Sequence, residues 1–171
     1  MKPIIMLDMD GVISDFISVY NAVAPSIDSK QKFHDAVRVH RIFANLPMLP
    51  NAKKLLSLLF DELQLEVQIL SSLGTYNKEV AIDVAAQKTK WLHMHDIKVS
   101  KVNFVNSWSL KENYSSSRTL MIDDRSDVIA SFTKHGGLGV LYDDAKFNTI
   151  KHEIIDKVEL IRNTAKAEVL V

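Results

Sequence analysis

The sequence contains no cysteine and carries no excess of charge of either sign. Without cysteine, disulfide bridges, thiolate nucleophiles and thiolate-bound zinc or iron–sulfur sites are excluded. Basic residues (Lys plus Arg) and acidic residues (Asp plus Glu) number 21 each, so no net positive field draws the molecule to nucleic acid or to an anionic membrane. We therefore expect no strong nucleic-acid binding.

Long hydrophobic runs are also missing near the N-terminus. The run from Ile4 to Leu7 stops at Asp8 and is too short for a signal peptide or a membrane span. These features predict a cytoplasmic protein with no membrane partner. The 171 residues, 47% of them hydrophobic and 25% charged, predict a single compact domain with a sizeable core and leave the oligomeric state open, a homodimer included.

Short apolar runs alternate with stretches of helical spacing along the chain. The apolar runs predict buried strands at residues 3–7, 65–70, 101–105, 119–122 and 138–142. The helical spacing predicts helices at residues 51–63, 77–95, 126–134 and 148–168. Because strand alternates with helix, we expect an α/β fold of three layers, with a Rossmann-like and mainly parallel sheet.

One long segment interrupts this alternation. From Gly11 to Pro50 the sequence has helical but no strand character, and connections of that length usually carry function. Pro47 and Pro50 favour an extended return to the main domain. We predict a small helical cap at residues 14–47, inserted after the first strand, and a core formed by residues 1–13 and 48–171.

Acidic residues follow two of the predicted strands. Asp8 and Asp10 come directly after the first strand, and Asp123 and Asp124 end the fourth. Because the carboxyl ends of parallel strands meet at one edge of a sheet, we expect these carboxylates to converge, which is costly unless a cation lies among them. All-oxygen ligands of this kind suit Mg²⁺.

Groups suited to an anion are predicted at the same edge. Ser71 and Ser72 close the second strand and would offer hydroxyl and backbone N–H groups to a phosphate, and Lys111 follows the third strand as a point positive charge. Each piece also has an ordinary structural explanation, since Asp-Gly forms turns and Ser-Ser or Asp-Asp can start a helix. Their occurrence together at one edge favours a functional site.

These motifs resemble those of the haloacid dehalogenase (HAD) superfamily of phosphohydrolases. The resemblance rests on Asp8-Met9-Asp10-Gly11 after an apolar strand, a serine ending the next strand, a lysine, and the pair Asp123-Asp124, in that order. Within the superfamily the sequence is most similar to the 5′(3′)-deoxyribonucleotidases, through residues 8–16, 46–52, 88–91 and 122–125. The resemblance implies a HAD-like fold and an Mg²⁺-dependent phosphomonoesterase that hydrolyses nucleoside monophosphates.

The available groups fit the tasks of such a reaction. Asp8 is the expected nucleophile that forms an aspartyl-phosphate, and Asp10 the expected general acid and base. Mg²⁺ would be held by Asp8, the backbone carbonyl of Asp10 and Asp124, with Asp123 in support and Asp127 as a weaker candidate. Ser71, Ser72 and Lys111 would bind the phosphoryl group.

Further residues have two interpretations each. A lysine on the helix at 77–95 ordinarily lies on a solvated face, so we treat Lys88 as a secondary substrate or structural contact. Phe16 would stack on a base or pack inside the cap, whereas core packing is expected for Tyr20 and Phe33. Trp108 would line the mouth of the site or act as a buried anchor.

Two other functions remain open at this stage. The same chemistry would serve a HAD phosphatase acting on sugar phosphates or on terminal phosphates of nucleic acids. A phospho-acceptor signalling or binding module also uses an acidic pocket, Mg²⁺, a hydroxyl and a lysine on a parallel sheet. The Asp-x-Asp motif favours the enzyme, because an acceptor module needs no acid two residues beyond its aspartate.

Overall fold

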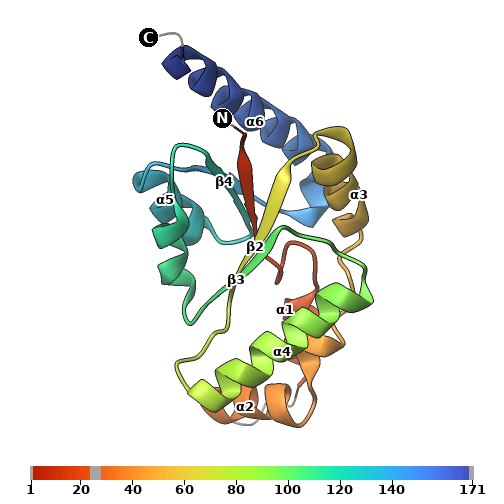
Figure 1. Ribbon diagram of the computed structural model, residues 1–171. Coiled ribbons are helices and arrows are strands. Elements are labelled where there is room, and N and C mark those ends of the chain that lie inside the picture. Colours follow the sequence, from red (N-terminus) through yellow and green to blue (C-terminus); the bar gives the residue numbers. More distant parts are fainter. Residues whose placement is uncertain (1, 24–27, 170–171) are drawn as a thin grey trace.

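The computed structural model describes residues 2–23 and 28–169 of the chain. Its single described sheet has five parallel strands, which are β1 (Ile4–Leu7), β2 (Glu66–Ser72), β3 (Lys101–Val105), β4 (Thr119–Asp123) and β5 (Leu138–Leu141). The strand order is β3-β2-β1-β4-β5, with β1 in the centre (Figure 1). The predicted α/β fold around a parallel sheet is confirmed.

Alternating side chains of the strands build a core on each face of the sheet. Ile5 and Leu7 of β1 belong to the larger apolar cluster, which includes residues of α3 (Ala52–Ser57) and α6 (Phe147–Val169). Met6, between them, belongs to a smaller cluster with residues of α5 (Ser126–Lys134), flanked by η3 (Trp108–Tyr114). This alternation is the period of two expected of a strand buried on both faces, and it gives the three layers of the fold.

The predicted cap region, residues 14–47, contains α1 (Phe16–Ala22), α2 (Ser29–Arg38) and the short helix η1 (Ile42–Ala44). We call it the cap segment; its residues 24–27 lie outside the described residues. These helices lie beside α4 (Lys78–Met94), away from the five strands (Figure 1). The cap segment and α4 therefore pack together beyond the carboxyl ends of the strands, within the same apolar cluster as one face of the sheet.

The chain enters and leaves the cap segment through two paired connections. The backbone N–H of Asp15 donates to the carbonyl of Pro47 at 2.9 Å, and that of Leu49 donates to Ile13 at 3.1 Å. Ser14 forms an antiparallel bridge with Met48 and a parallel bridge with Asp10. The two connections are thus hydrogen-bonded to each other, and Ser14 also pairs with Asp10, which follows β1.

The helix predicted at 51–63 is interrupted in the structure. After α3 the chain continues as a π-helical turn, η2 (Leu58–Glu62), in which the N–H of Leu63 bonds the carbonyl of Leu58 at 3.0 Å. The wider turn leaves Leu58 and Leu59 buried in the core. A short helix, η4 (Asp144–Lys146), precedes α6, and no helix in the described part of the chain is long and apolar enough to cross a membrane.

Candidate active site

The candidate site lies where the order of the strands reverses direction. β1 pairs with β2 on one side and with β4 on the other, so the connections that follow these strands diverge at its carboxyl end. In open parallel sheets such a point leaves a crevice that binds ligands. Asp8 directly follows β1, and its N–H donates to the carbonyl of Ile122 in β4 at 3.0 Å.

A tight loop after β1 sets the positions of the next residues. The carbonyl of Met9 accepts hydrogen bonds from the N–H groups of Ile13 and Ser14, each at 2.9 Å. Gly11 has a φ of +79°, a left-handed conformation that other residues adopt at a cost. A Cβ atom on Gly11 would lie 2.2 Å from Oδ2 of Asp124, so glycine also makes room for that carboxylate.

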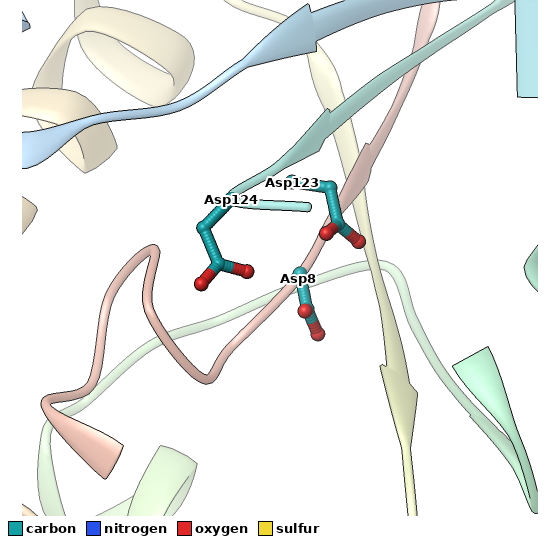
Figure 2. Close-up of side chains that lie close together, drawn as sticks. All are labelled: Asp8, Asp123 and Asp124. Atoms are coloured by element: carbon teal, nitrogen blue, oxygen red, sulfur yellow. The ribbon is translucent and has the colours of Figure 1, made fainter. Parts of the chain in front are cut away.

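Three carboxylates converge at this edge. Asp8 comes from the end of β1, while Asp123 and Asp124 come from the end of β4, and their side chains gather in one place (Figure 2). One oxygen of each lies within 4.8 Å of the others. Asp8 and Asp123 are buried and Asp124 is half-buried, so the mutual repulsion of these groups is poorly screened by solvent.

Lys111 offsets part of this repulsion. Its ammonium lies 2.8 Å from Oδ2 of Asp8 and 2.6 Å from Oδ2 of Asp123, and its side chain is 1% exposed. Burial lowers the pKa of this ammonium, but the charges of Asp8 and Asp123 outweigh that effect and raise it above its ordinary value. Lys111 is therefore a permanent positive charge beneath the carboxylates.

The remaining repulsion shows in the pKa values of the acids. Burial, reinforced by the charge of Asp8, raises the pKa of Asp124 to about 6. The same two causes raise the pKa of Asp123, and Lys111 opposes them. Burial also raises the pKa of Asp10, which Lys88 opposes, although 22% of the Asp10 side chain is open to the pocket.

The charges and oxygen atoms of the site fit a divalent cation. When all four carboxyl groups, those of Asp8, Asp10, Asp123 and Asp124, are ionised, they exceed the two ammonium groups of Lys88 and Lys111 by two negative charges. Asp123 already accepts from Lys111 through Oδ2 and from the Arg125 N–H through Oδ1 at 2.9 Å. Asp124 is therefore better suited than Asp123 to bind a cation directly.

Lys88, expected as a secondary substrate or structural contact, does not lie on the solvated face that is ordinary for a lysine on a helix. Lys88 is fully buried, and its ammonium donates to Oδ2 of Asp10 at 2.6 Å, to Oγ of Ser71 at 2.9 Å and to the carbonyl of Ser72 at 2.8 Å. It lies four residues after Val84 and three before Trp91, both buried on the same face of α4. The burial of Lys88 could have been predicted from this spacing.

The two predicted phosphate-binding serines occupy different environments. Ser71 is fully buried, accepts a hydrogen bond from Lys88 and is not one of the residues that line the pocket. Ser72 lines the pocket, and its Oγ accepts from the N–H of Gly74 at 3.1 Å. Both lie at the end of β2, beside the carboxylate cluster.

A pocket of about 260 Å³ opens beside the carboxylates and is lined on one side by aromatic rings of the cap segment. Phe16 and Phe43 are stacked with their centroids 5.3 Å apart, and Phe33 meets Phe43 edge-on at 6.2 Å. Phe33 packs against the core, as expected, and its half-buried ring also lines the pocket. Tyr20 likewise packs against the core and stacks on Phe16. Phe43 was not among the residues singled out from the sequence.

The opposite rim of the pocket comes from the core. Trp108 is 39% exposed and lines the pocket together with Arg125, whose guanidinium lies 4.5 Å from the ring centroid. Arg125 also pairs with Asp127 at 2.7 Å. Asp127 is thus engaged in the first turn of α5 and is not one of the three clustered carboxylates, which weakens it further as a metal ligand.

Comparisons with known proteins concern the fold only. No protein-family model matches the chain, and no curated protein matches its sequence. It is similar to D,D-heptose 1,7-bisphosphate phosphatase from Burkholderia thailandensis, with 11% identity and a TM-score of 0.47 over 80% of this chain and 75% of that one. It is also similar to a HAD-superfamily hydrolase from Ehrlichia chaffeensis, with 17% identity and a TM-score of 0.47 over 92% and 99% of the two chains. Because unrelated functions share such folds, the chemistry must be derived from the site residues.

Proposed function

We propose that the protein is a Mg²⁺-dependent phosphomonoesterase that acts through an aspartyl-phosphate, with nucleoside monophosphates as its substrates and deoxyribonucleotides preferred. The observation that carries this proposal is the convergence of Asp8, Asp123 and Asp124 around Lys111 at the carboxyl edge of the sheet. Such an arrangement supplies a carboxylate nucleophile and the positive charge that a phosphoryl group requires.

In the first step Asp8 attacks phosphorus. An oxygen of the Asp8 carboxylate forms a bond to phosphorus while the bond from phosphorus to the leaving oxygen breaks, and Asp10 gives its proton to that oxygen. Burial raises the pKa of Asp10, which favours its protonated form relative to an ordinary carboxyl group. Lys111, 2.8 Å from Asp8, holds the nucleophile in place.

In the second step the intermediate is hydrolysed. Asp10, now a carboxylate, takes a proton from a water molecule whose oxygen bonds to phosphorus, and the bond between phosphorus and Asp8 breaks. Inorganic phosphate leaves, and both aspartates return to their starting forms. The hydroxyl of Ser71 and the backbone around Ser72 would hold the phosphoryl oxygens in both steps.

The metal site of this proposal is formed by three groups. Asp8, Asp124 and the backbone carbonyl of Asp10 would hold Mg²⁺, and Asp123 would support them through Lys111 and the loop after β4. When bound, Mg²⁺ neutralises the excess negative charge of the site and of the phosphoryl oxygens.

The shape of the pocket supports a nucleotide. Aromatic rings of the cap segment line the same pocket as Asp10, beside which the leaving group of the substrate would lie, and a flat base can pack against such rings. Phe16 is our candidate for this contact. A sugar phosphate would leave the rings without a partner of matching shape.

The strand order argues against the phospho-acceptor module. Signalling receivers of that type use a doubly wound order in which the first and third strands are neighbours. Here β1 lies between β2 and β4, and β3 is at the edge. Asp10 also lies at the pocket, and burial raises its pKa, which a long-lived phospho-acceptor does not require.

A substrate panel tests the proposal. Phosphate release is measured for deoxynucleoside and ribonucleoside monophosphates, sugar phosphates, a 3′-phosphorylated oligonucleotide and an aryl phosphate, with Mg²⁺ and with EDTA. We expect many turnovers per molecule, the highest kcat/KM for deoxynucleotides, and no turnover in EDTA. Acid-quenched samples should carry a phosphoryl group on Asp8 by mass spectrometry. A single stable phosphorylation without turnover would instead identify a phospho-acceptor module.

A further inference from the structure

Lys88 is a buried charge that the proposed reaction leaves without a role. Its side chain reaches from α4 into the site, where it is 1% exposed, and all three of its N–H groups have acceptors. Burying an ammonium carries a desolvation cost that its paired contacts must offset. The three contacts supply this pairing, and all three partner residues have proposed catalytic or phosphate-binding roles.

The contact with Lys88 holds one oxygen of the Asp10 carboxylate. Oδ2 of Asp10 lies 2.6 Å from the ammonium, and Oδ1 accepts from the hydroxyl of Ser14 at 3.2 Å. Because the two oxygens are held from different directions, rotation of the carboxyl plane would break one of the contacts. Without Lys88, the carboxyl group would be held only through Ser14, whose hydroxyl also lies 3.1 Å from the Met9 carbonyl.

The cap segment covers the same ammonium. The ring of Phe43 lies with its centroid 4.8 Å from Nζ of Lys88, a cation–π distance, and Phe43 stacks on Phe16. Phe43 is 3% exposed, so this face of the ammonium is closed to water. Phe43, which stacks on the proposed base contact Phe16, therefore also contacts Lys88, and Lys88 in turn contacts the proposed proton donor Asp10.

We propose that Lys88 is a positioning residue that aligns Asp10 with the leaving oxygen and is itself held in place by Phe43 of the cap segment. This inference rests on the proposed phosphatase function and assigns no substrate contact to Lys88. As Asp8 bonds to phosphorus and the bond to the leaving oxygen breaks, the proton of Asp10 reaches that oxygen only if the carboxyl group is correctly oriented.

A leaving-group series separates this role from a purely structural one. A good leaving group such as 4-nitrophenolate departs without a proton, whereas an alkoxide requires one. The value of kcat/KM is measured for 4-nitrophenyl phosphate, phenyl phosphate and an alkyl phosphate, for the wild type and for Lys88→Met. We expect a loss of about 100-fold with the alkyl phosphate and of less than about fivefold with 4-nitrophenyl phosphate, in line with the usual contribution of general acid catalysis.

Two further variants keep the test decisive. Phe43→Leu retains the buried charge but removes the ring, and we expect it to show the same dependence on the leaving group with a smaller loss. Lys90→Met changes an exposed lysine on the same helix and is the matched control, with kcat/KM near that of the wild type for all three substrates. Thermal unfolding of each variant reports its folding.

Each result decides the inference. An equal loss of kcat/KM with every leaving group, or no loss, would overturn the role of Lys88 while leaving the phosphatase function intact. If Lys88→Met fails to fold and Phe43→Leu shows no dependence on the leaving group, Lys88 is structural and the inference is also overturned. A wild-type protein that hydrolyses none of the three esters would instead overturn the proposed function itself.

Discussion

The carboxyl edge of the sheet and the cap segment line the same pocket, but they differ in the side chains that they contribute. The edge concentrates buried charge, with Lys111 within hydrogen-bonding distance of both Asp8 and Asp123. The described residues of the cap segment contribute aromatic rings and Ile17, and no charged group, to the pocket lining. Under the proposed function, the edge would react with the phosphate and the cap segment would select the group attached to it.

Replacing the nucleophile should have the largest effect on the charged side. Asp8→Asn keeps the shape of the side chain but removes its nucleophilic charge, so we expect kcat for an aryl phosphate to fall by at least about 1,000-fold. Lys111 keeps Asp123 as a partner, so the fold should survive, and circular dichroism checks this. Near-normal turnover by the variant would rule out Asp8 as the nucleophile.

The repulsion among the carboxylates predicts how stability depends on pH and on Mg²⁺. A carboxyl group with a raised pKa binds its proton more tightly in the folded chain, so the free energy of unfolding should fall as pH rises from the ordinary value of 3.8 through about 6 for Asp124. Mg²⁺ bound at the ionised site should reverse this loss. At pH 8, and at a Mg²⁺ concentration 100 times the Kd for that pH, we expect Tm to rise by roughly 5 to 10 °C. At the same Mg²⁺ concentration and pH 5 we expect a smaller rise.

Differential scanning calorimetry measures this effect. Asp124→Asn is the informative variant, because it removes one of the proposed ligands and should lose most of the Mg²⁺-dependent gain at pH 8. A rise in Tm of equal size at both pH values, or one retained by the variant, would show that Mg²⁺ acts elsewhere.

Gly11 tests whether the position of Asp124 matters for metal binding. Gly11→Ala introduces a Cβ atom against Asp124 at a positive φ, so we expect the Mg²⁺ concentration for half-maximal activity to rise roughly 10- to 100-fold. Gly136→Ala is a matched control, because Gly136 also has a positive φ, of +95°, with nothing within 4 Å of an added Cβ. Both variants should lose stability, and only the first should change the Mg²⁺ requirement.

The cap side should show the smallest and most selective effect. Phe16→Leu removes the ring proposed to stack on the base, so we expect KM for deoxynucleoside monophosphates to rise about tenfold, as for the loss of one stacking contact. KM for glycerol phosphate should not change. Tyr20→Leu alters a ring that stacks behind Phe16 without lining the pocket, and it should have the weaker effect. Equal changes for both esters would contradict base stacking.

The sequence predicted the sheet and its charged edge better than the environment of the pocket. Apolar runs ending in Asp8 and Asp123 carry a strong local pattern, and parallel pairing brings such ends together whatever the details of the connections. The position of Lys88 depended instead on which face of α4 meets the cap segment. One face of that helix is buried, so Lys88 lies in the interior, whereas its sequence position indicated only a secondary substrate or structural contact.

The aromatic lining was harder to predict for a different reason. Phe33 and Phe43 belong to α2 and η1, whose placement is determined by tertiary packing on α4 and on each other. No period in the sequence relates two short helices across a loop. The left-handed Arg41 that precedes η1, with a φ of 50°, is likewise a feature that only the folded chain reveals.

The paired connections at Ser14 and Met48 have a mechanical consequence. If the cap segment tilts to admit a substrate or release phosphate, the rotation axis must pass near these two hydrogen-bonded connections. Points close to a pivot travel least, and Asp10 bridges directly to Ser14. Opening and closing would therefore move the aromatic rings of the outer helices much further than Asp10, which lies near the rotation axis.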